Sequence, residues 1–255
     1  MPVLMTRAPH LPPLKRVGHK GADLVAPGNT IESFEAALEH GVHMIEFDVL
    51  QMRDGSLVLA HDFRDAYSRE TVTLEEGLDH FAGEAYADVE LDVDLKLPGY
   101  ERQVGEALFE RELGARSLIS STWEQSLDVL GEAAPGVRRG WSVPRARRDY
   151  LKSFLRPATM AVAIYMRRRF PSRAAAMIRT GRCEAIMAHW LLASARLVDH
   201  VHAVGGQVYI WTVDDAVRIR LLDAMGVDGV ITNDPRLFDA DTGQARRLAD
   251  LADPA

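Results

Sequence analysis

Short apolar segments typical of β-strands alternate with helix-like segments along the chain, and no linker rich in Pro, Gly or Ser interrupts them. This order predicts a parallel sheet, because parallel neighbours need long crossover connections that are usually helical. Eight segments have strand character: residues 15–18, 42–49, 90–97, 118–121, 137–143, 185–188, 207–212 and 227–232. We therefore predict an α/β TIM (β/α)8 barrel. Residues 1–255 would form one domain, with an N-terminal tail at 1–14.

The composition agrees with one large core and limits the environment. The chain has 255 residues, of which 47% are hydrophobic, so it can bury a core of barrel size. Its single cysteine, Cys183, excludes an internal disulfide, so nothing demands an oxidising compartment. The N-terminal residues are interrupted by prolines and lack a secretory signal, and no apolar run is long enough to cross a bilayer. We expect a soluble, cytoplasmic protein.

Two histidines, His19 and His61, bracket a segment that carries two closely spaced carboxylates. Residues 42–49 are typical of a strand, and side chains two apart on a strand share a face, so Glu46 and Asp48 converge. Such carboxylates are costly unless lysine or arginine pairs with them or a divalent ion lies between them, and oxygen ligands suit Mg²⁺ or Ca²⁺. Histidine transfers protons near neutral pH. The segment therefore predicts a metal-assisted phosphodiester site.

The predicted third strand, residues 90–97, alternates charged and apolar side chains. Taken alone, this alternation is more typical of a half-exposed strand with one solvated face. In a barrel, the face with Asp92, Asp94 and Lys96 would instead point toward the axis, where charge is tolerated chiefly at the catalytic end. The barrel prediction favours the second interpretation.

Four short motifs follow one another with a helix-like segment between them: His19-Lys20-Gly21, Pro27-Gly28-Asn29-Thr30, Glu46-Phe47-Asp48 and His61-Asp62. In order and spacing they resemble the glycerophosphodiester phosphodiesterase family, whose pattern is His-Arg-Gly, Pro-Glu-Asn-Thr, Glu-x-Asp and His-Asp. The resemblance is strongest at 16–62 and 184–235 and poor at 136–182. The chain departs from the pattern at Lys20 in place of Arg, at Gly28 in place of Glu, and at Asp94 in place of a third-strand Glu.

The resemblance implies the same barrel, a divalent metal ion (Mg²⁺ or Ca²⁺) and a set of site residues. The implied metal ligands are Glu46, Asp48 and Asp94, the implied catalytic residues are His19 and His61, and the implied substrate-binding residues are Lys20, Lys96 and Trp211. Ordinary core packing is an equally good interpretation of Trp211. One histidine would take a proton from the attacking oxygen, and we provisionally assign protonation of the leaving alcohol to His61.

Three functional hypotheses follow. The leading one is hydrolysis of small-molecule glycerophosphodiesters to glycerol 3-phosphate and an alcohol. A second is a lysophospholipase D-like activity on lysophospholipids. A third is an inactive ligand-binding barrel, which the departures at Lys20, Gly28 and Asp94 suggest.

Charge is segregated along the chain. Residues 138–182 hold thirteen Arg or Lys and one acid, a local charge of +12, whereas the net charge is −7, so the remainder carries −19. Aromatic residues are interleaved with the basic ones, as on membrane-surface helices, so a basic helical segment at 144–182 could contact anionic membranes weakly. A solvated helical cover or a dimer interface explains the pattern better. Nucleic acid is not expected, because the acidic remainder would repel it. The oligomeric state stays open.

Overall fold

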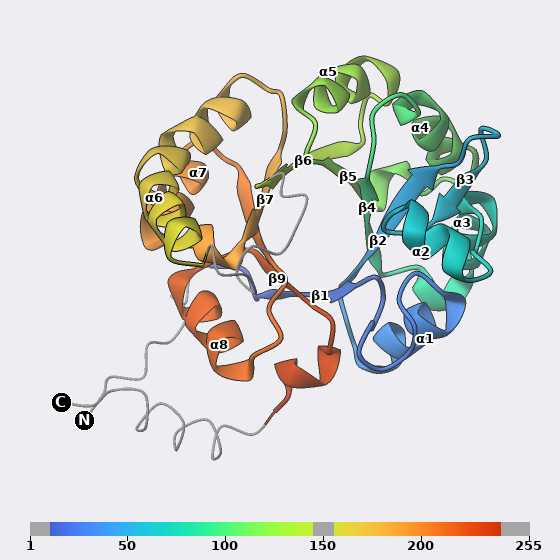
Figure 1. Cartoon of the computed structure of the whole chain (residues 1–255), viewed down its shortest axis with the longest axis horizontal. Coiled ribbons are helices and arrows are strands. Elements are labelled where there is room, and N and C mark those ends of the chain that lie inside the picture. Colours follow the sequence, from blue (N-terminus) through green and yellow to red (C-terminus); the bar gives the residue numbers. More distant parts are fainter. Residues whose placement is uncertain (1–10, 145–155, 241–255) are drawn as a thin grey trace.

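The computed structural model describes residues 11–144 and 156–240, and in them a parallel barrel is closed by pairing of β1 with β2 (Figure 1). The sheet order is β1-β9-β8-β7-β6-β5-β4-β2, and β3 is added beside β2. The strands are β1 Lys15–His19, β2 Met44–Gln51, β3 Leu57–Leu59, β4 Glu90–Leu95, β5 Ser117–Ser121, β6 Arg138–Val143, β7 Ala185–His189, β8 Gln207–Trp211 and β9 Gly229–Thr232. The TIM barrel prediction is confirmed, and each predicted strand overlaps one barrel strand.

Helices follow the barrel strands and form the outer ring. They are α1 Ile31–Glu39, α2 Phe63–Ser68, α3 Leu74–Phe81, α4 Glu101–Glu110, α5 Glu124–Ala133, α6 Arg156–Arg179, α7 Ala195–His202 and α8 Ala216–Met225. Thr30 caps the N-terminus of α1: its hydroxyl accepts the Ser33 N–H at 3.2 Å, and the Ser33 hydroxyl accepts the Thr30 N–H. This reciprocal cap satisfies two backbone donors that the helix itself cannot pair.

The register between β1, β2 and β4 lines up the polar side chains. His19 lies opposite Glu46, and on the other side of β2 the residues Glu46 and Asp48 lie opposite Asp92 and Asp94. The alternate residues of β4 are apolar and pack into the layer under the helices: Leu91, Val93 and Leu95. Because successive strand residues point to opposite faces, the charged face of β4 lines the barrel interior.

Apolar residues form one layer outside the barrel and another inside it. Outside, Phe34 of α1, Phe47 of β2 and Phe81 of α3 pack with ring centroids 4.7–6.0 Å apart. The interior is filled by Val17, Met44, Leu118, Ala185, Met187, Tyr209 and Ile231. At the N-terminal end of the barrel, Glu90 pairs with Lys15 and Arg138. These ion pairs fill the N-terminal end of the barrel. The polar groups at its C-terminal end face the opening, which we call the mouth.

A hairpin of β2 and β3 brings His61 back to the barrel mouth. β3 pairs antiparallel with the end of β2, and Leu59 lies opposite Val49. The chain then enters the short helix α2, whose first N–H groups are capped by Asp62. His61 thus follows a short strand that lies outside the barrel.

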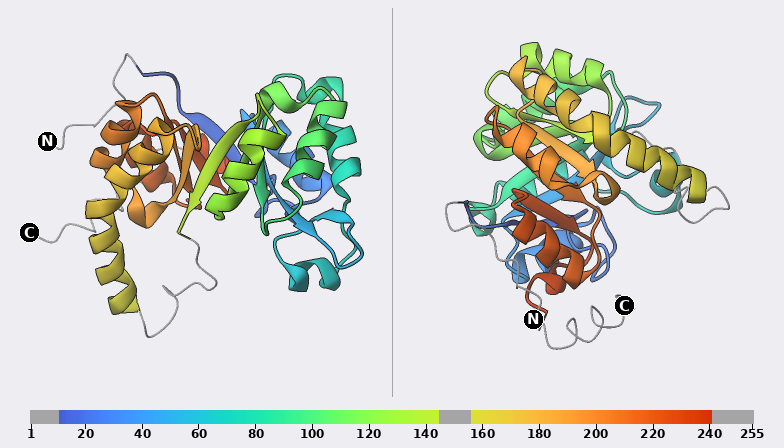
Figure 2. Two further views of the ribbon diagram at one scale, coloured as in Figure 1. Left: turned by 90° about the horizontal axis from the view of Figure 1, so that it is seen from above. Right: turned by 90° about the vertical axis from the view of Figure 1, so that its left-hand side faces the viewer.

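The basic residues at 138–182 are divided between three parts of the structure. Residues 138–143 form β6, residues 145–155 lie outside the described residues, and α6 begins at Arg156. The predicted N-terminal tail likewise lies outside the described residues as far as residue 10. Figure 2 shows the N-terminal part of α6 and the helix α2 extending past the strands on the same side of the barrel. None of the described helices is long and apolar enough to cross a membrane.

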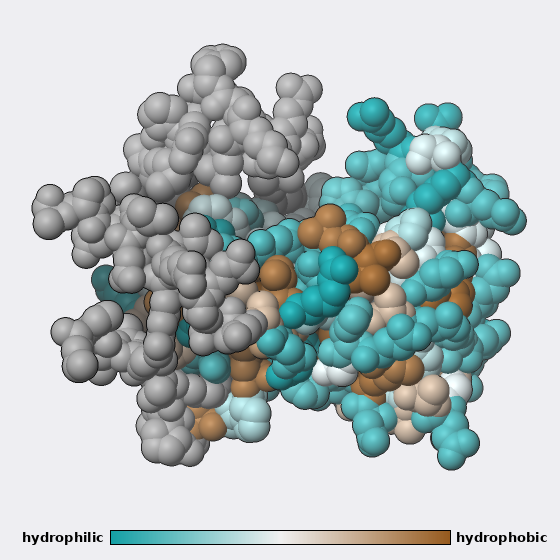
Figure 3. All heavy atoms as spheres, turned by 90° about the horizontal axis from the view of Figure 1, so that it is seen from below, coloured by the Kyte–Doolittle hydropathy of each residue, from teal (hydrophilic) through white to brown (hydrophobic). Residues whose placement is uncertain are grey.

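Several basic side chains of this segment pair with acids elsewhere. Arg139 pairs with Glu184, Arg182 pairs with Asp128 and Glu124, and Arg173 also pairs with Glu124. These pairs are consistent with the helical-cover interpretation. Figure 3 shows a face that is mostly hydrophilic where it is not grey, with apolar groups in separate small patches.

Candidate active site

Three carboxylates meet at the C-terminal end of the barrel. Each of Glu46, Asp48 and Asp94 offers an oxygen atom within 4.8 Å of those of the others. Glu46 and Asp48 are buried, and Asp94 is partly buried. Lys96, just after β4, places its Nζ against Asp48 Oδ1 and Asp94 Oδ2. The structure therefore brings together the three predicted metal ligands and one predicted phosphate-binding lysine.

The loop between β1 and α1 makes hydrogen bonds to both carboxylates of β2. Asn29 donates from Nδ2 to Asp48 Oδ2 at 2.9 Å, and its Oδ1 accepts the Asp48 N–H at 3.0 Å. The Lys20 N–H donates to Glu46 Oε2 at 2.8 Å. Lys20 and Asn29 have positive φ values, 51° and 59°. Left-handed backbone is disfavoured for non-glycine residues and clusters at functional sites. The loop therefore adopts a strained conformation in which it makes these hydrogen bonds to Glu46 and Asp48.

Burial and the neighbouring charges shift the pKa values of Glu46 and Asp48 in opposite directions. Burial and the charge of Asp48 raise the pKa of Glu46 well above its ordinary value. Burial also disfavours the ionised form of Asp48, but the charges of Lys96 and the two histidines outweigh it and lower the pKa of Asp48. Likewise burial opposes the charge on Lys96, but Asp48 and Asp94 raise the pKa of Lys96 well above its ordinary value. Asp48 is thus ionised beside a charged lysine.

The free oxygen atoms of the cluster fit a divalent cation. Asp94 Oδ1 is buried and accepts no hydrogen bond from the described residues, whereas Asp48 Oδ1 is paired with Lys96 Nζ. A buried acceptor without a donor costs about 1–3 kcal/mol. Three carboxylates with oxygen atoms to spare are the ligands that Mg²⁺ and Ca²⁺ prefer. The residues present could hold such an ion.

His19 lies partly buried between the carboxylates and the C-terminal strand, with its side chain 19% exposed. Its Nε2 is 3.8 Å from Glu46 Oε2, and its Nδ1 is 2.5 Å from Asn233 Oδ1. Burial, together with the charge of Lys20, lowers the pKa of His19 below its ordinary value. A neutral imidazole is therefore favoured at neutral pH, and this is the form that can accept a proton.

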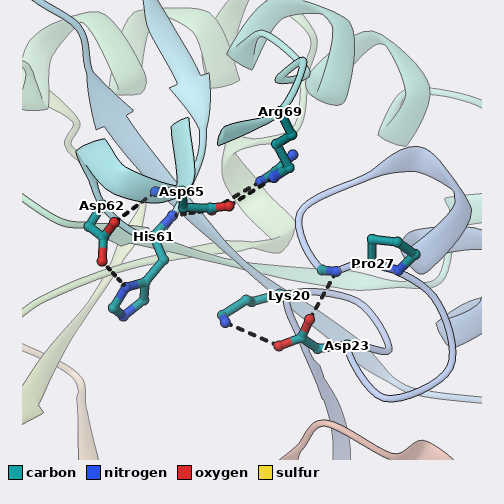
Figure 4. A pocket seen from close by; sticks show the side chains of 8 residues that line it. Lys20, Asp23, Pro27, His61, Asp62, Asp65 and Arg69 are labelled. Atoms are coloured by element: carbon teal, nitrogen blue, oxygen red, sulfur yellow. Dashed lines mark hydrogen bonds and ion pairs between the residues drawn. The ribbon is translucent and has the colours of Figure 1, made fainter. Parts of the chain in front are cut away.

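His61 lies across the mouth on the hairpin side. Its side chain is 53% exposed, and its Nδ1 lies 3.4 Å from Asp62 Oδ2. A pocket between the hairpin and the first loop is lined by Lys20, Asp23, Pro27, Gly28, His61, Asp62, Asp65 and Arg69. Figure 4 shows Lys20 and His61 reaching into this space from opposite sides. The two predicted histidines therefore lie at different depths, His19 partly buried and His61 open to solvent.

The departure at Gly28 has a local structural reason. The Gly28 N–H donates to Asp23 Oδ1 at 2.9 Å, and the other oxygen of Asp23 accepts from Lys20 Nζ at 3.1 Å. A Cβ at position 28 would lie 2.5 Å from Asp23 Oδ1. Burial opposes the charge of Lys20, but Asp48 and Asp23 raise the pKa of Lys20. Asp23 thus pairs with Lys20 and occupies the space that a side chain at position 28 would need.

Trp211 ends β8 at the mouth and is partly buried. Its Nε1 donates to the Met187 carbonyl at 2.9 Å, and its ring meets His189 edge to face with centroids 5.1 Å apart. Its position permits contact with a bound ligand, whereas its hydrogen bond also serves packing. It lies on the barrel wall made by β7 and β8, away from the residues that line the pocket.

Four residues around the site were absent from the sequence prediction: Asp23, Asn29, Asp214 and Asn233. Asn29 lies inside a motif that was identified, and Asn233 directly follows a predicted strand, so both carried a positional signal. Asp23 and Asp214 are loop acids that no local pattern distinguishes from solvated ones.

Comparison with known proteins identifies relatives over most of the chain. The model of the glycerophosphoryl diester phosphodiesterase family matches residues 19–95 and 65–237. The chain is 26% identical over 253 residues to a glycerophosphodiester phosphodiesterase of Caldanaerobacter subterraneus subsp. tengcongensis, covering 86% of this chain and 93% of that protein. It is also 26% identical over 261 residues to the glycerophosphodiester phosphodiesterase GDPD4 of Arabidopsis thaliana, covering 90% of this chain and 73% of that protein.

Solved structures share the fold. A glycerophosphodiester phosphodiesterase of Agrobacterium tumefaciens superposes with a TM-score of 0.66 at 18% identity, covering 89% of this chain and all of that one. A phosphodiesterase of Oleispira antarctica, determined with the product sn-glycerol-3-phosphate, gives 0.64 at 20% identity, covering 90% of this chain and 98% of that one. These likenesses agree with the barrel described above.

Proposed function

Since the chain belongs to the glycerophosphoryl diester phosphodiesterase family and is a phosphoric diester hydrolase, we propose that it cleaves small glycerophosphodiesters to glycerol 3-phosphate and an alcohol. One observation carries this proposal: Glu46, Asp48 and Asp94 converge beside a partly buried histidine, with two lysines next to them. The product complex of the Oleispira antarctica relative supports the same substrate class.

The carboxylates Glu46, Asp48 and Asp94 would hold Mg²⁺ or Ca²⁺. When bound, such an ion polarises a phosphoryl oxygen and neutralises charge that develops in the transition state. Asp94 is one methylene shorter than the family's glutamate, but Lys96 already draws it toward Asp48. Lys20 and Lys96 add positive charge for the phosphate. Lys20 acts as a point charge, so it orients the phosphate less strictly than a forked arginine would.

His19 and His61 would share the proton transfers. His19 is partly buried and its pKa is lowered, so it suits removal of a proton from the attacking oxygen, which in the family can be the glycerol 2-hydroxyl. The exposed His61, next to the carboxylate of Asp62, suits protonation of the leaving alcohol at the pocket. Trp211 would pack against the glycerol carbons.

A lysophospholipase D-like activity is a second candidate. Phe63 and Tyr67 on α2 are exposed and pack with ring centroids 6.4 Å apart, close in sequence to His61. Rings at this place could contact an acyl chain. Weak contact of the basic segment with anionic membranes would favour the same substrate, because α6 extends on the same side as α2. A cytoplasmic location stays a prediction from the sequence.

The test is phosphodiesterase activity on glycerophosphocholine and on lysophosphatidylcholine, with Mg²⁺ or Ca²⁺ present and after chelation. We expect faster release of choline from glycerophosphocholine and loss of activity on chelation. Asp48→Asn should lower turnover by orders of magnitude while circular dichroism shows that the fold is retained. Full activity in Asp48→Asn, or after exhaustive chelation, would contradict the metal proposal. Inactivity on both substrates would favour a ligand-binding barrel.

A further inference from the structure

Asn233 connects His19 to a carboxylate on a neighbouring loop. Asn233 follows β9, and its Oδ1 lies 2.5 Å from His19 Nδ1. Its Nδ2 donates to Asp214 Oδ2 at 2.6 Å, and Asp214 lies in the loop after β8. The strands β8, β9 and β1 are consecutive neighbours in the barrel. Three adjacent strands therefore each contribute one member of a line of hydrogen bonds that ends at the active site.

The remaining oxygen of Asp214 fixes this loop. Asp214 Oδ1 accepts the Asn233 N–H at 2.8 Å and the hydroxyl of the buried Thr232 at 3.1 Å. The Asn233 carbonyl in turn accepts the Leu24 N–H at 2.9 Å. Both the backbone and the side chain of Asn233 are thus held on two sides, which leaves its amide little freedom to turn.

These bonds decide which ring nitrogen of His19 carries the proton. An ionised carboxylate only accepts hydrogen bonds, so the NH₂ group of Asn233 must face Asp214. The amide oxygen of Asn233 then faces His19, and it can only accept. In neutral imidazole one nitrogen donates and the other accepts, so the proton lies on Nδ1. Nε2 is left with its lone pair on the side of Glu46, at a distance too long for a hydrogen bond.

We propose that Asn233 and Asp214 are positioning residues that hold His19 as its Nδ1–H tautomer, with Nε2 directed at the reacting groups. This inference rests on the proposed function for its consequence, namely that His19 acts as the base and His61 serves the leaving alcohol. In other enzymes too, a hydrogen-bonding partner selects the tautomer of a histidine. A wrong tautomer can lower turnover by several orders of magnitude.

Asp214→Asn replaces one oxygen with an NH₂ group and so reverses the donor and acceptor roles along the hydrogen bonds from position 214 to His19. The new amide must keep its oxygen toward the Asn233 N–H and the Thr232 hydroxyl, so its NH₂ group faces the NH₂ group of Asn233. Turning the Asn233 amide removes that clash but presents NH₂ to His19 Nδ1. His19 must then accept at Nδ1 and carry its proton on Nε2. We expect a fall of about 10²–10⁴-fold in kcat and an equal fall in kcat/KM.

The exchanged pair, Asp214→Asn with Asn233→Asp, restores the original direction. The new amide at position 214 donates to the new carboxylate at position 233, and the same carboxylate accepts from His19 Nδ1. The oxygen of that amide still accepts from residues 232 and 233. We expect this double variant to recover turnover to within about tenfold of the wild type, because the tautomer of His19 is again the productive one.

A carboxylate–histidine pair elsewhere in the chain gives a matched control. His202 Nε2 lies 2.8 Å from Asp228 Oδ2, at the opposite end of the barrel. Asp228→Asn makes the same single atom change beside a histidine that lies far from the site. This variant should leave kcat unchanged.

The decisive readout is the tautomer itself, measured by ¹⁵N NMR of the ring nitrogens in histidine-labelled, metal-loaded protein at pH 8.5. We expect Nδ1–H in the wild type and the exchanged pair, and Nε2–H in Asp214→Asn. Nδ1–H retained in Asp214→Asn with unchanged kcat would overturn the proposal, as would an exchanged pair no better than the single variant. If the wild type hydrolysed no phosphodiester, the proposed function would fail while the spectrum still reported the tautomer.

Discussion

Asn29 holds Asp48 by two hydrogen bonds, one to the carboxylate and one from the backbone N–H. Asn29 is fully buried and adopts a left-handed backbone conformation. Because the amide meets both the main chain and the side chain of the same residue, it fixes the direction in which the Asp48 carboxylate points. The remaining oxygen, Oδ1, is thereby directed toward Lys96 and the proposed ion.

Removal of this amide should weaken metal binding. Outer partners of metal-binding carboxylates typically contribute 10–100-fold in affinity, so we expect a loss of about that size in Asn29→Ala and Asn29→Gly. The glycine variant tolerates the positive φ, so it separates the loss of hydrogen bonds from backbone strain. Calorimetric titration with Mn²⁺ or Ca²⁺ measures the affinity. Unchanged binding in Asn29→Gly would show that Asp48 needs no such support.

Gly28→Glu should be unfavourable in this chain although it restores the family residue. The new Cβ would lie 2.5 Å from Asp23 Oδ1 and 2.9 Å from Lys20 Cβ, so the Lys20–Asp23 pair must shift. We expect a loss of about 1–3 kcal/mol in unfolding free energy. Adding Asp23→Ala should recover part of it, because the new glutamate can then pair with Lys20. Urea denaturation compares the wild type, the two single variants and the double variant, and additive losses in the double variant would argue against this exchange of partners.

Glu90 should stabilise the protein in a pH-dependent way. Burial opposes its ionisation, but the Lys15 hydrogen bond and the charge of Arg138 outweigh burial and lower the pKa of Glu90. A carboxyl whose pKa is lower in the folded state stabilises above its unfolded pKa, and this contribution is lost as pH falls through the folded pKa. Glu90→Gln should therefore cost about 1–3 kcal/mol at pH 7. The difference should shrink progressively as the pH falls below about 4.5.

Urea denaturation at pH 7 and at pH 3.5 measures this difference. Glu110→Gln is the matched control, because Glu110 is 75% exposed and lies 3.9 Å from Arg111, so its pair should contribute little. An equal cost of Glu90→Gln at both pH values would mean that the loss arises from packing rather than from charge.

Contact with anionic membranes should depend on the exposed arginines of α6. Arg168 and Arg169 are exposed, and Arg169 lies over the ring of Tyr165 with its Cζ 5.6 Å from the centroid. Arg167 is a poorer site for substitution, because it donates to the Ala193 carbonyl. We expect weak co-sedimentation with phosphatidylserine vesicles at low salt, and its loss in Arg168→Gln with Arg169→Gln.

The matched control for that loss is Arg53→Gln with Arg102→Gln, which removes the same charge from exposed positions elsewhere. Binding that survives in the α6 variant, or no binding by the wild type at low salt, would contradict membrane contact through α6. The helical-cover interpretation of this segment would then stand.

The sequence by itself predicted every barrel strand and the face on which the carboxylates lie. Glu46 and Asp48 share a face because strand side chains alternate, and Thr30 caps α1 because its hydroxyl reaches the third N–H of the helix. Both effects act over a few residues, so local pattern was enough. The inward direction of Asp94 and Lys96 was predicted once a closed barrel was assumed, since the alternation itself fits either face.

The partners that orient the site came only with the tertiary structure. Asn233 reaches His19 across 214 residues of sequence, and β3 turns back to bring His61 to the mouth. Neither placement follows from periodicity, because each depends on how the barrel closes and on the register between strands that are distant in sequence. Local pattern sets the direction of a side chain along its own strand. The choice of side chain that it meets is decided by closure of the whole sheet.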